Sequence, residues 1–407
     1  MTWNGHAVCL AAAAMLCTGT AGTALAAEYG PGASETEIKI GNTMAYSGPV
    51  SPYGTIGKAV AACLQEQNDK GGINGRKITY ITLDDAYSPP KTVEQTRKLV
   101  ESDEVLAVVQ SLGTPTSASV RKYLNQKGVP QLLIASGGSM WGDYKDFPWT
   151  MGFQPSYRTE AQVYGKWVAK EYPDAKIAIL SQNDDYGRDY RTGFLEGLGD
   201  KVKQIVGEQT YESTDPTVDS QIINLKNSGA DVFFNITTAK FSAQAIRKMA
   251  DIGWKPLHIL NGVSNSVGAV LTPAGLDKSV GIISADYLKD PTDPVWQSDP
   301  DYKEWVAFMD NAYKGDKLDK FNVYAYASCK TLIKIIEQMG DTLTRENMLK
   351  QAENLDYAPP MVLPGIKVKT GPDDHFPVEQ MQLIRFDGKE WVRFGEILDV
   401  GGDSGGS

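Results

Sequence analysis

The chain has 407 residues, of which 42% are hydrophobic and 22% are charged. It can therefore bury large cores, and because it is too long for one ordinary domain we expect two lobes. The net charge of −10 lacks the basic excess that binding to nucleic acid requires, so nucleic acid is not an expected partner.

Residues 1–27 are predicted to be a secretory signal peptide. An alanine-rich apolar stretch at residues 7–27 ends in the tetrapeptide Ala-Leu-Ala-Ala, which has the small-residue pattern of a signal-peptidase site. The alternative is a first transmembrane helix, and residues 1–6 lack the Lys or Arg that a signal usually carries. No later segment approaches the ~20 apolar residues needed to cross a bilayer, so we expect an exported protein that is free in solution outside the cytoplasm.

Removal of this signal leaves two cysteines, Cys63 and Cys329. An exported protein permits such a pair to form a disulfide. Both cysteines fall in predicted helices, so two separate buried thiols are an equally favoured alternative.

Four strand–helix repeats are predicted in the first part of the chain. Strands are expected at residues 37–45, 77–83, 105–109 and 131–135, with helices at 55–69 and 91–101 and from Pro115 onward. Thr114 is expected to cap the helix that begins at Pro115. Such repeats are typical of a doubly wound parallel sheet, in which ligands bind at the carboxyl ends of the strands.

Two of these strands end in small hydroxyl residues and glycines. One leads to Ser111 and Thr114, and the next leads to the sequence Ser-Gly-Gly-Ser at residues 136–139. Free backbone N–H groups and a helix N-terminus at one edge favour negative charge. The edge is therefore predicted to bind a carboxylate or another small anion; the alternative is that Thr114 and Ser136 only cap helices.

A second α/β series is predicted from residue 156 onward. Its helices are expected at residues 156–172, 188–198, 218–228 and 241–252, and its strands at 176–181, 202–211, 231–236 and 257–260. An apolar run at 281–285 then leads back toward the first lobe, with helices at 300–314 and 322–339. Strand-like runs at 367–370, 381–386 and 391–397 indicate an antiparallel appendage.

These elements predict a chain that crosses between its lobes more than once. We expect lobe one to comprise residues 28–152 and 286–345, lobe two residues 153–285 and 346–400, and a disordered tail at 401–407. A hinge made of several crossing segments suits rigid-body closure on a trapped ligand.

The sequence nominates no catalytic equipment. The turn after the first strand lacks the glycines of a dinucleotide-binding fingerprint, and neither a P-loop nor a Gly-x-Ser-x-Gly elbow occurs. His258 and His375 have no neighbouring ligands at metal spacing, so no metal or cofactor is expected. The acidic pairs at 84–85 and 184–185 are interpreted as turn and helix caps rather than as a calcium or acid–base site. A binding protein, not an enzyme, is predicted.

Several ordered motifs make the chain resemble the leucine/isoleucine/valine-binding protein family. They are Ile-Lys-Ile-Gly at 38–41, Ser-Gly-Pro at 47–49, Asn-Asp-Lys-Gly-Gly-Ile-Asn-Gly-Arg-Lys at 68–77, Asp-Asp at 84–85 and Asp-Tyr-Gly at 185–187. Members of this family are the type I periplasmic solute-binding components of ATP-binding cassette importers. The resemblance implies two Rossmann-like lobes with a three-segment hinge, an inner-membrane permease as partner, and a ligand whose carboxylate is held by lobe one.

The resemblance also assigns roles to particular residues. Thr114 matches a serine that holds the ligand carboxylate, and residues 136–139 match a second carboxylate-binding loop. Tyr53 and Tyr186 match aromatic residues that stack on the ligand, although they could also only fill the mouth of the cleft. Tyr324 and Tyr326 lie where the family places further aromatic residues, and Trp141 lies near the first crossing. The candidate ligand-binding residues are Tyr53, Ser111, Thr114, Ser136, Gly137, Gly138, Ser139, Phe153, Tyr157, Tyr186, Thr238, Asn265 and Tyr326.

One departure from the family pattern concerns the ligand's amino group. Amino-acid binders of the family place an acidic residue on lobe two, but the corresponding residues 261–266 contain no carboxylate, and Thr238 lies where a tyrosine is usual. Asp184 or Asp185 could substitute. The simpler expectation is a small carboxylate without an ammonium group, with aromatic acids favoured. The alternatives are a branched-chain amino-acid binder and, from another class, a ligand sensor coupled to a receptor.

Overall fold

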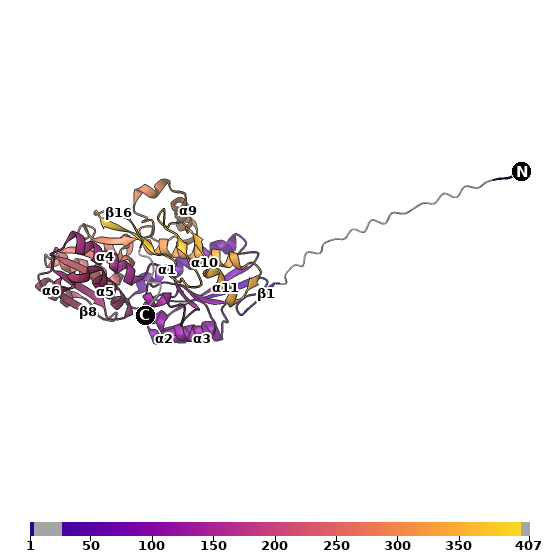
Figure 1. The fold of residues 1–407 in the computed structure, drawn as a ribbon, viewed down its shortest axis with the longest axis horizontal. Helices are drawn as coiled ribbons and strands as arrows, with labels where there is room; N and C mark the ends of the chain where they lie inside the picture. The colour runs from indigo at the N-terminus through magenta and orange to yellow at the C-terminus, as the bar shows by residue number, and fades with distance from the viewer. Residues whose placement is uncertain (4–26, 400–407) are drawn as a thin grey trace.

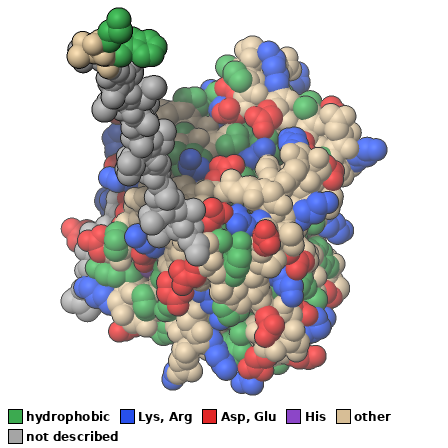
Figure 2. Space-filling view, turned by 90° about the vertical axis from the view of Figure 1, so that its right-hand side faces the viewer, with side chains coloured by type: hydrophobic (Ala, Val, Ile, Leu, Met, Phe, Trp, Pro, Cys, Tyr) green, Lys and Arg blue, Asp and Glu red, His purple; other side chains and the backbone are tan. Residues whose placement is uncertain are grey.

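The structure is a computed structural model that describes residues 1–3 and 27–399. The predicted signal peptide lies almost entirely, and the predicted tail at 401–407 entirely, outside the described residues. Two α/β lobes lie side by side, which confirms the predicted fold class (Figure 1). Among the described residues, no helix combines the length and the apolar character needed to span a membrane. Basic and acidic side chains are mixed over the face seen in Figure 2.

The first lobe is built on a parallel sheet with the strand order β3-β2-β4-β5-β6. The strands are β2 (Glu37–Met44), β3 (Lys77–Asp84), β4 (Ala107–Val109), β5 (Gln131–Ile134) and β6 (Thr150–Gly152), and the helices between them are α1 (Gly54–Asp69), α2 (Pro89–Glu101) and α3 (Thr114–Gln126). The strand order reverses between β2 and β4, and such a switch point opens a crevice at the carboxyl ends of the two strands.

The second lobe contains a larger sheet with the order β16-β15-β11-β10-β9-β7-β8. Its parallel strands are β7 (Ile177–Gln182), β8 (Ile205–Tyr211), β9 (Val232–Ile236), β10 (Leu257–Leu260) and β11 (Ile283–Asp286). The helices are α4 (Tyr157–Glu171), α5 (Asp185–Leu198), α6 (Asp219–Asn227), α7 (Ala239–Asp251) and α8 (Thr272–Ala274). The strand predicted from residue 202 begins only at Ile205, because Gly199 has a positive φ of 54° and opens a 3-10 turn.

The C-terminal hairpin extends the sheet of the second lobe. β15 (Gln380–Phe386) pairs antiparallel with both β11 and β16 (Trp391–Asp399), which confirms the predicted antiparallel tail. The helices α9 (Pro300–Phe308) and α10 (Lys320–Met339) of the first lobe precede this hairpin in the chain. The helix predicted over residues 300–314 changes after Phe308 into a π-helical turn, which ends where Lys314 adopts a left-handed conformation.

Part of the chain after α10 contacts the first lobe, although residues from 346 onward were expected in lobe two. Asn347 of α11 (Arg345–Ala352), which was expected in lobe two, donates hydrogen bonds to the carbonyls of Met339 at 3.2 Å and Thr342 at 2.7 Å, both in the expected lobe one. The His375 ring likewise contacts the carbonyl of Thr150 at 2.8 Å. Among the described residues after α10, only β15 and β16 join the sheet of the second lobe. The short strands here are β1 (Glu28–Tyr29), β12 (Thr342–Leu343), β13 (Asp356–Tyr357) and β14 (Val368–Lys369).

A disulfide joins α1 to α10. The sulfur atoms of Cys63 and Cys329 are bonded, with a Cα–Cα distance of 6.5 Å, so the choice that the sequence left open is resolved in favour of a bridge. The bond ties α10, which belongs to a late segment of the chain, to the first helix of the first lobe. It therefore fixes the position of the helix whose first turns border the space between the lobes.

Replacing both Cys63 and Cys329 with alanine is expected to lower the free energy of unfolding by roughly 2–5 kcal/mol, because the bond closes a very long loop. Denaturant unfolding curves of the oxidised protein and the double variant measure this difference. A reductant should lower the midpoint of the native protein and leave that of the double variant unchanged. Equal midpoints for the oxidised protein and the variant would contradict the expectation.

Candidate functional site

A cavity lies between the two lobes, bordered by segments from both of them and from the crossings. Its wall is mostly apolar and aromatic, as is usual for pockets that bind small molecules. The aromatic and polar side chains that line it are Tyr53, Tyr87, Thr114, Gln154, Tyr157, Glu160, Tyr186, Thr238, Asp286, Tyr287, Lys320, Phe321 and Tyr324.

The N-terminus of α3 forms one part of the cavity wall. Gly113 precedes the helix with a φ of 97°, and a side chain there would collide with the ring of Tyr87, so the turn requires glycine. Thr114 is the first residue of the helix and makes no capping bond, so its predicted capping role is wrong. The first N–H groups of a helix have no intrahelical acceptor and favour a nearby anion.

Hydrogen bonding around Ser136 fixes the direction of the Thr114 hydroxyl. The Ser136 oxygen accepts hydrogen bonds from the Gly138 N–H at 3.2 Å and the Trp141 indole N–H at 3.1 Å. A hydroxyl has two acceptor positions and one proton, so Ser136 must donate its proton to Thr114 Oγ1, which lies 2.7 Å away. The proton of Thr114 is then free to donate into the cavity.

Tyrosine side chains form a second part of the wall and join the lobes. The Tyr53 hydroxyl of the first lobe donates to the carbonyl of Val263 at 3.0 Å and accepts from the N–H of Ala239 at 3.0 Å, both in the second lobe. Burial raises the pKa of Tyr53 to about 12, so the phenol stays neutral. The two bonds of Tyr53 therefore bring the lobes into contact across the cavity. Within the second lobe, Tyr157 of α4 and Tyr186 of α5 meet edge to face, with ring centroids 5.2 Å apart.

Glu160 brings a buried carboxyl group to the cavity from α4. Its oxygens accept hydrogen bonds from the Gly262 N–H at 2.7 Å and from the hydroxyls of Tyr164 and Tyr190, each at 2.8 Å. Burial outweighs these bonds and raises the pKa of Glu160 to about 7. The loop at residues 261–266 carries no carboxylate of its own, but α4 places the carboxyl group of Glu160, which was not predicted from the sequence, against Gly262.

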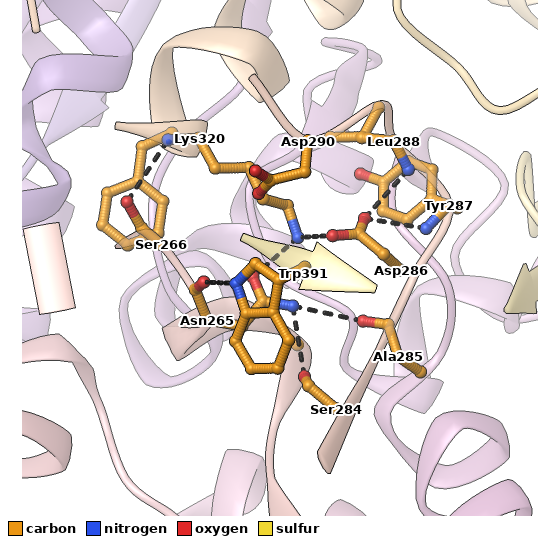
Figure 3. Close-up of polar contacts among 12 residues, drawn as sticks. Asn265, Ser266, Ser284, Ala285, Asp286, Tyr287, Leu288, Asp290, Lys320 and Trp391 are labelled. Atoms are coloured by element: carbon orange, nitrogen blue, oxygen red, sulfur yellow. Dashed lines mark hydrogen bonds and ion pairs between the residues drawn. The ribbon is translucent and has the colours of Figure 1, made fainter. Parts of the chain in front are cut away.

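A buried ion pair completes the wall where the chain returns to the first lobe (Figure 3). The ammonium group of Lys320, at the start of α10, contacts the carboxylate of Asp286, at the end of β11, and donates to Asn265 Oδ1 at 2.7 Å. The other oxygen of Asp286 accepts from the backbone N–H groups of Tyr287 and Leu288 at 2.8 and 2.9 Å. Asp290 lies beside the pair, and burial raises its pKa to about 6.

The model of the family described as periplasmic binding protein matches residues 37–390. The chain belongs to this family. A curated relative, the Leu/Ile/Val-binding protein homolog 2 of Brucella abortus, is 28% identical over 322 residues, which cover 76% of this chain and 80% of the relative.

Solved structures of periplasmic binding proteins share the fold of this one. A branched-chain amino acid ABC transporter protein from Thermus thermophilus with bound valine superposes with a TM-score of 0.81 at 15% identity, covering 89% of this chain and 97% of that one. A solute-binding protein of an ABC transporter from R. palustris in complex with benzoate gives a TM-score of 0.76 at 20% identity, covering 88% and 96%. At these identities the likeness shows the fold alone.

The structure brings only some of the predicted site residues to the cavity of this periplasmic binding protein. Tyr53, Thr114, Tyr157, Tyr186 and Thr238 line it. Ser136 does not line the cavity but is hydrogen-bonded to Thr114, which does, and the Asn265 side chain likewise accepts a hydrogen bond from Lys320. Their roles in binding stay predictions.

The other candidate residues do not line the cavity, and most of them make hydrogen bonds or packing contacts that support its wall. The Ser111 hydroxyl accepts from the Thr43 N–H, Gly137 accepts from the Tyr157 N–H, and the Gly138 N–H donates to Ser136. Ser139 contacts Asp189 of the second lobe, and the ring of Phe153 packs behind Tyr324. Tyr326 faces away, with its hydroxyl on Glu304 at 2.7 Å, so its predicted place at the cleft is wrong.

Several lining residues were not predicted from the sequence, namely Tyr87, Glu160, Asp286, Tyr287, Lys320 and Phe321. Glu160 follows Tyr157 by three positions on α4, so it shares a helix face with a residue that was predicted. That spacing is the signal that could have found it. The pairing of Asp286 with Lys320 joins distant segments, and no local pattern indicates it.

The raised pKa of Glu160 predicts a pH dependence of stability. The folded state binds a proton more tightly than the unfolded chain, so the contribution of Glu160 is fully present below its ordinary pKa of 4.5 and is lost as the pH rises to about 7. Chemical denaturation across this range should show less pH dependence in a Glu160→Gln variant than in the native protein. Subtracting the two curves removes the contributions of Asp290 and Asp319, whose pKa values are also raised. Parallel curves would contradict the assignment.

Proposed function

We propose that this protein is the periplasmic substrate-binding component of an ATP-binding cassette importer, which captures a small carboxylate between its lobes and delivers it to an inner-membrane permease. The family and the relatives described as transporter components support this role. The proposal assigns no reaction to the chain. The ligand that the cavity fits best is an aromatic or other organic acid.

The main observation in favour of a carboxylate ligand is the orientation of the Thr114 hydroxyl. Its hydroxyl proton is left free by the bonds of Ser136, and it lies at the N-terminus of α3 on the cavity wall. A hydroxyl donor and a positive helix end together favour an anion. The tyrosine rings of the wall offer flat apolar surface to the rest of the ligand.

The two carboxyl groups on the cavity wall, Asp286 and Glu160, already have partners within the protein, which favours a ligand without an ammonium group. Asp286 is already paired with Lys320. Glu160 has three donors within the protein, and its pKa of about 7 leaves it only partly ionised at neutral pH. Neither carboxyl group therefore depends on a ligand cation for its stabilisation.

A branched-chain amino acid is the second candidate, and Glu160 is the observation that favours it. Ionised Glu160 on the wall would pair with an α-ammonium group. The two candidates differ in their response to pH around the pKa of about 7. Amino-acid binding would strengthen as Glu160 ionises, whereas binding of an organic acid would stay level or weaken, because a second negative charge enters the cavity.

Calorimetric titrations with benzoate and leucine at about pH 6 and about pH 8 are expected to show binding of benzoate that does not strengthen with pH. Tight binding of leucine that strengthens with pH, together with no binding of benzoate or other organic acids, would contradict the organic-acid assignment. Stabilisation of the protein by the same compounds in thermal unfolding provides an independent readout.

Thr114→Val is expected to weaken binding of the organic acid by roughly tenfold to a hundredfold, because it keeps the shape and removes a hydrogen bond to a charged group. The matched control is Thr96→Val, since Thr96 is buried in α2 away from the cavity and its hydroxyl has no partner. Calorimetry measures both dissociation constants. Unchanged affinity in Thr114→Val would show that this edge does not hold the carboxylate.

A further inference from the structure

Three tyrosine hydroxyls on the cavity wall are buried without a hydrogen-bond partner, those of Tyr186, Tyr287 and Tyr324. Two of these residues are close in the chain to the buried ion pair: Tyr287 directly follows Asp286, and Tyr324 lies one turn after Lys320 on α10. Each side chain is 8% exposed. A buried hydroxyl without a partner costs free energy, and such groups in native proteins call for an explanation. Both residues line the cavity, so a ligand atom is the partner that fits.

Lys320 also lines the cavity. An ammonium group has three donors, and the structure gives Lys320 two acceptors, Asp286 and Asn265. One donor is left for the cavity. Tyr324 lies one turn after Lys320 on α10, and Tyr287 directly follows Asp286. The ion pair between Lys320 and Asp286, which Figure 3 shows, therefore ties together the two segments that carry these donors.

The charges around Lys320 decide what kind of atom these donors fit. Asp286 neutralises the ammonium group, and the carboxyl groups of Asp290 and Glu160 also lie within its electrostatic range. A second carboxylate on the ligand would therefore meet an excess of negative charge. A hydroxyl or carbonyl oxygen accepts from the same donors without adding charge.

We propose that Tyr287, Tyr324 and Lys320 form a second polar subsite, which binds a neutral oxygen of the ligand. This subsite makes the preferred substrate a hydroxy or oxo acid instead of an unsubstituted carboxylic acid. The inference rests on the proposed function, since it assumes that the ligand carboxylate lies at Thr114. It adds a specificity element contributed by the crossing after β11 and by the start of α10.

Calorimetric titration with benzoate, meta- and para-hydroxybenzoate and terephthalate tests the subsite. In the native protein, one of the hydroxybenzoates is expected to bind about tenfold or more tightly than benzoate, which is the effect of roughly one good hydrogen bond. Terephthalate, with a second carboxylate, is expected to bind more weakly than the preferred hydroxybenzoate.

The double variant Tyr287→Phe/Tyr324→Phe keeps both rings and removes only the hydroxyls, so it is expected to bind the preferred hydroxybenzoate no more tightly than benzoate. Tyr80→Phe is the matched control, because Tyr80 lies on β3 and does not line the cavity. The control should keep the preference. Lys320 is left intact, because its removal would leave the buried carboxylate of Asp286 unpaired and strongly destabilise the protein.

The outcomes separate this inference from the proposed function. If benzoate binds but the hydroxybenzoates bind no tighter, or if the double variant weakens both equally, the subsite is overturned and the proposed function stands. If no aromatic acid binds, the aromatic-acid assignment and the subsite both fail. If benzoate affinity is lost in the double variant but kept in Thr114→Val, the carboxylate itself lies at this group, and the proposal of a second subsite is wrong.

Thermal unfolding without ligand provides a further check. Removing an unpaired buried hydroxyl relieves a desolvation cost, so the double variant is expected to be as stable as the native protein or more stable. A clear loss of stability would show that the two hydroxyls serve the fold, which would overturn their assignment to a ligand.

Discussion

The ammonium group of Lys320 and the carboxylate of Asp286 join the two lobes at the point where the chain crosses back from the second to the first. Lys320 begins α10, and Asp286 ends β11. Both charges are buried, so removing either would leave the other unpaired at a cost of roughly 3–5 kcal/mol. Because Asp286 also binds the backbone N–H groups of Tyr287 and Leu288, the pair sets the conformation of the crossing as well as the distance between the lobes.

The cavity beside this pair is organised by hydrogen bonds whose direction can be worked out. Ser136 uses both acceptor positions on Gly138 and Trp141, and this leaves Thr114 as a donor. Glu160 is an acceptor with its donors supplied by the protein. The wall of the first lobe therefore presents donors to an anion, while the acids of the second lobe are occupied. This asymmetry, rather than the overall shape shared with other periplasmic binding proteins, distinguishes candidate ligands.

Much of the fold and part of the cavity follow from the sequence for physical reasons. Parallel strands have carboxyl ends that meet at one edge, so Thr114 after β4 was predicted to lie at a ligand-binding edge, and it lines the cavity. Tyr186, at the start of α5, was assigned by the family resemblance, and it also lines the cavity. Tyr324 and Tyr326 show where such reasoning stops. They are about 200° apart around α10, so one faces the cavity and the other faces Glu304, and the choice depends on how the helix packs.

The lining residues that were not predicted from the sequence are brought to the cavity by interactions between distant segments of the chain. The loop at residues 261–266 contains no acid, but Glu160 lies against it, because α4 brings Glu160 to Gly262 from about a hundred residues earlier in the chain. The most direct test of the account is a crystal structure with the tightest-binding organic acid. The account predicts its carboxylate within hydrogen-bond distance of Thr114 Oγ1. A carboxylate held by Lys320, or a ligand ammonium on Glu160, would contradict it.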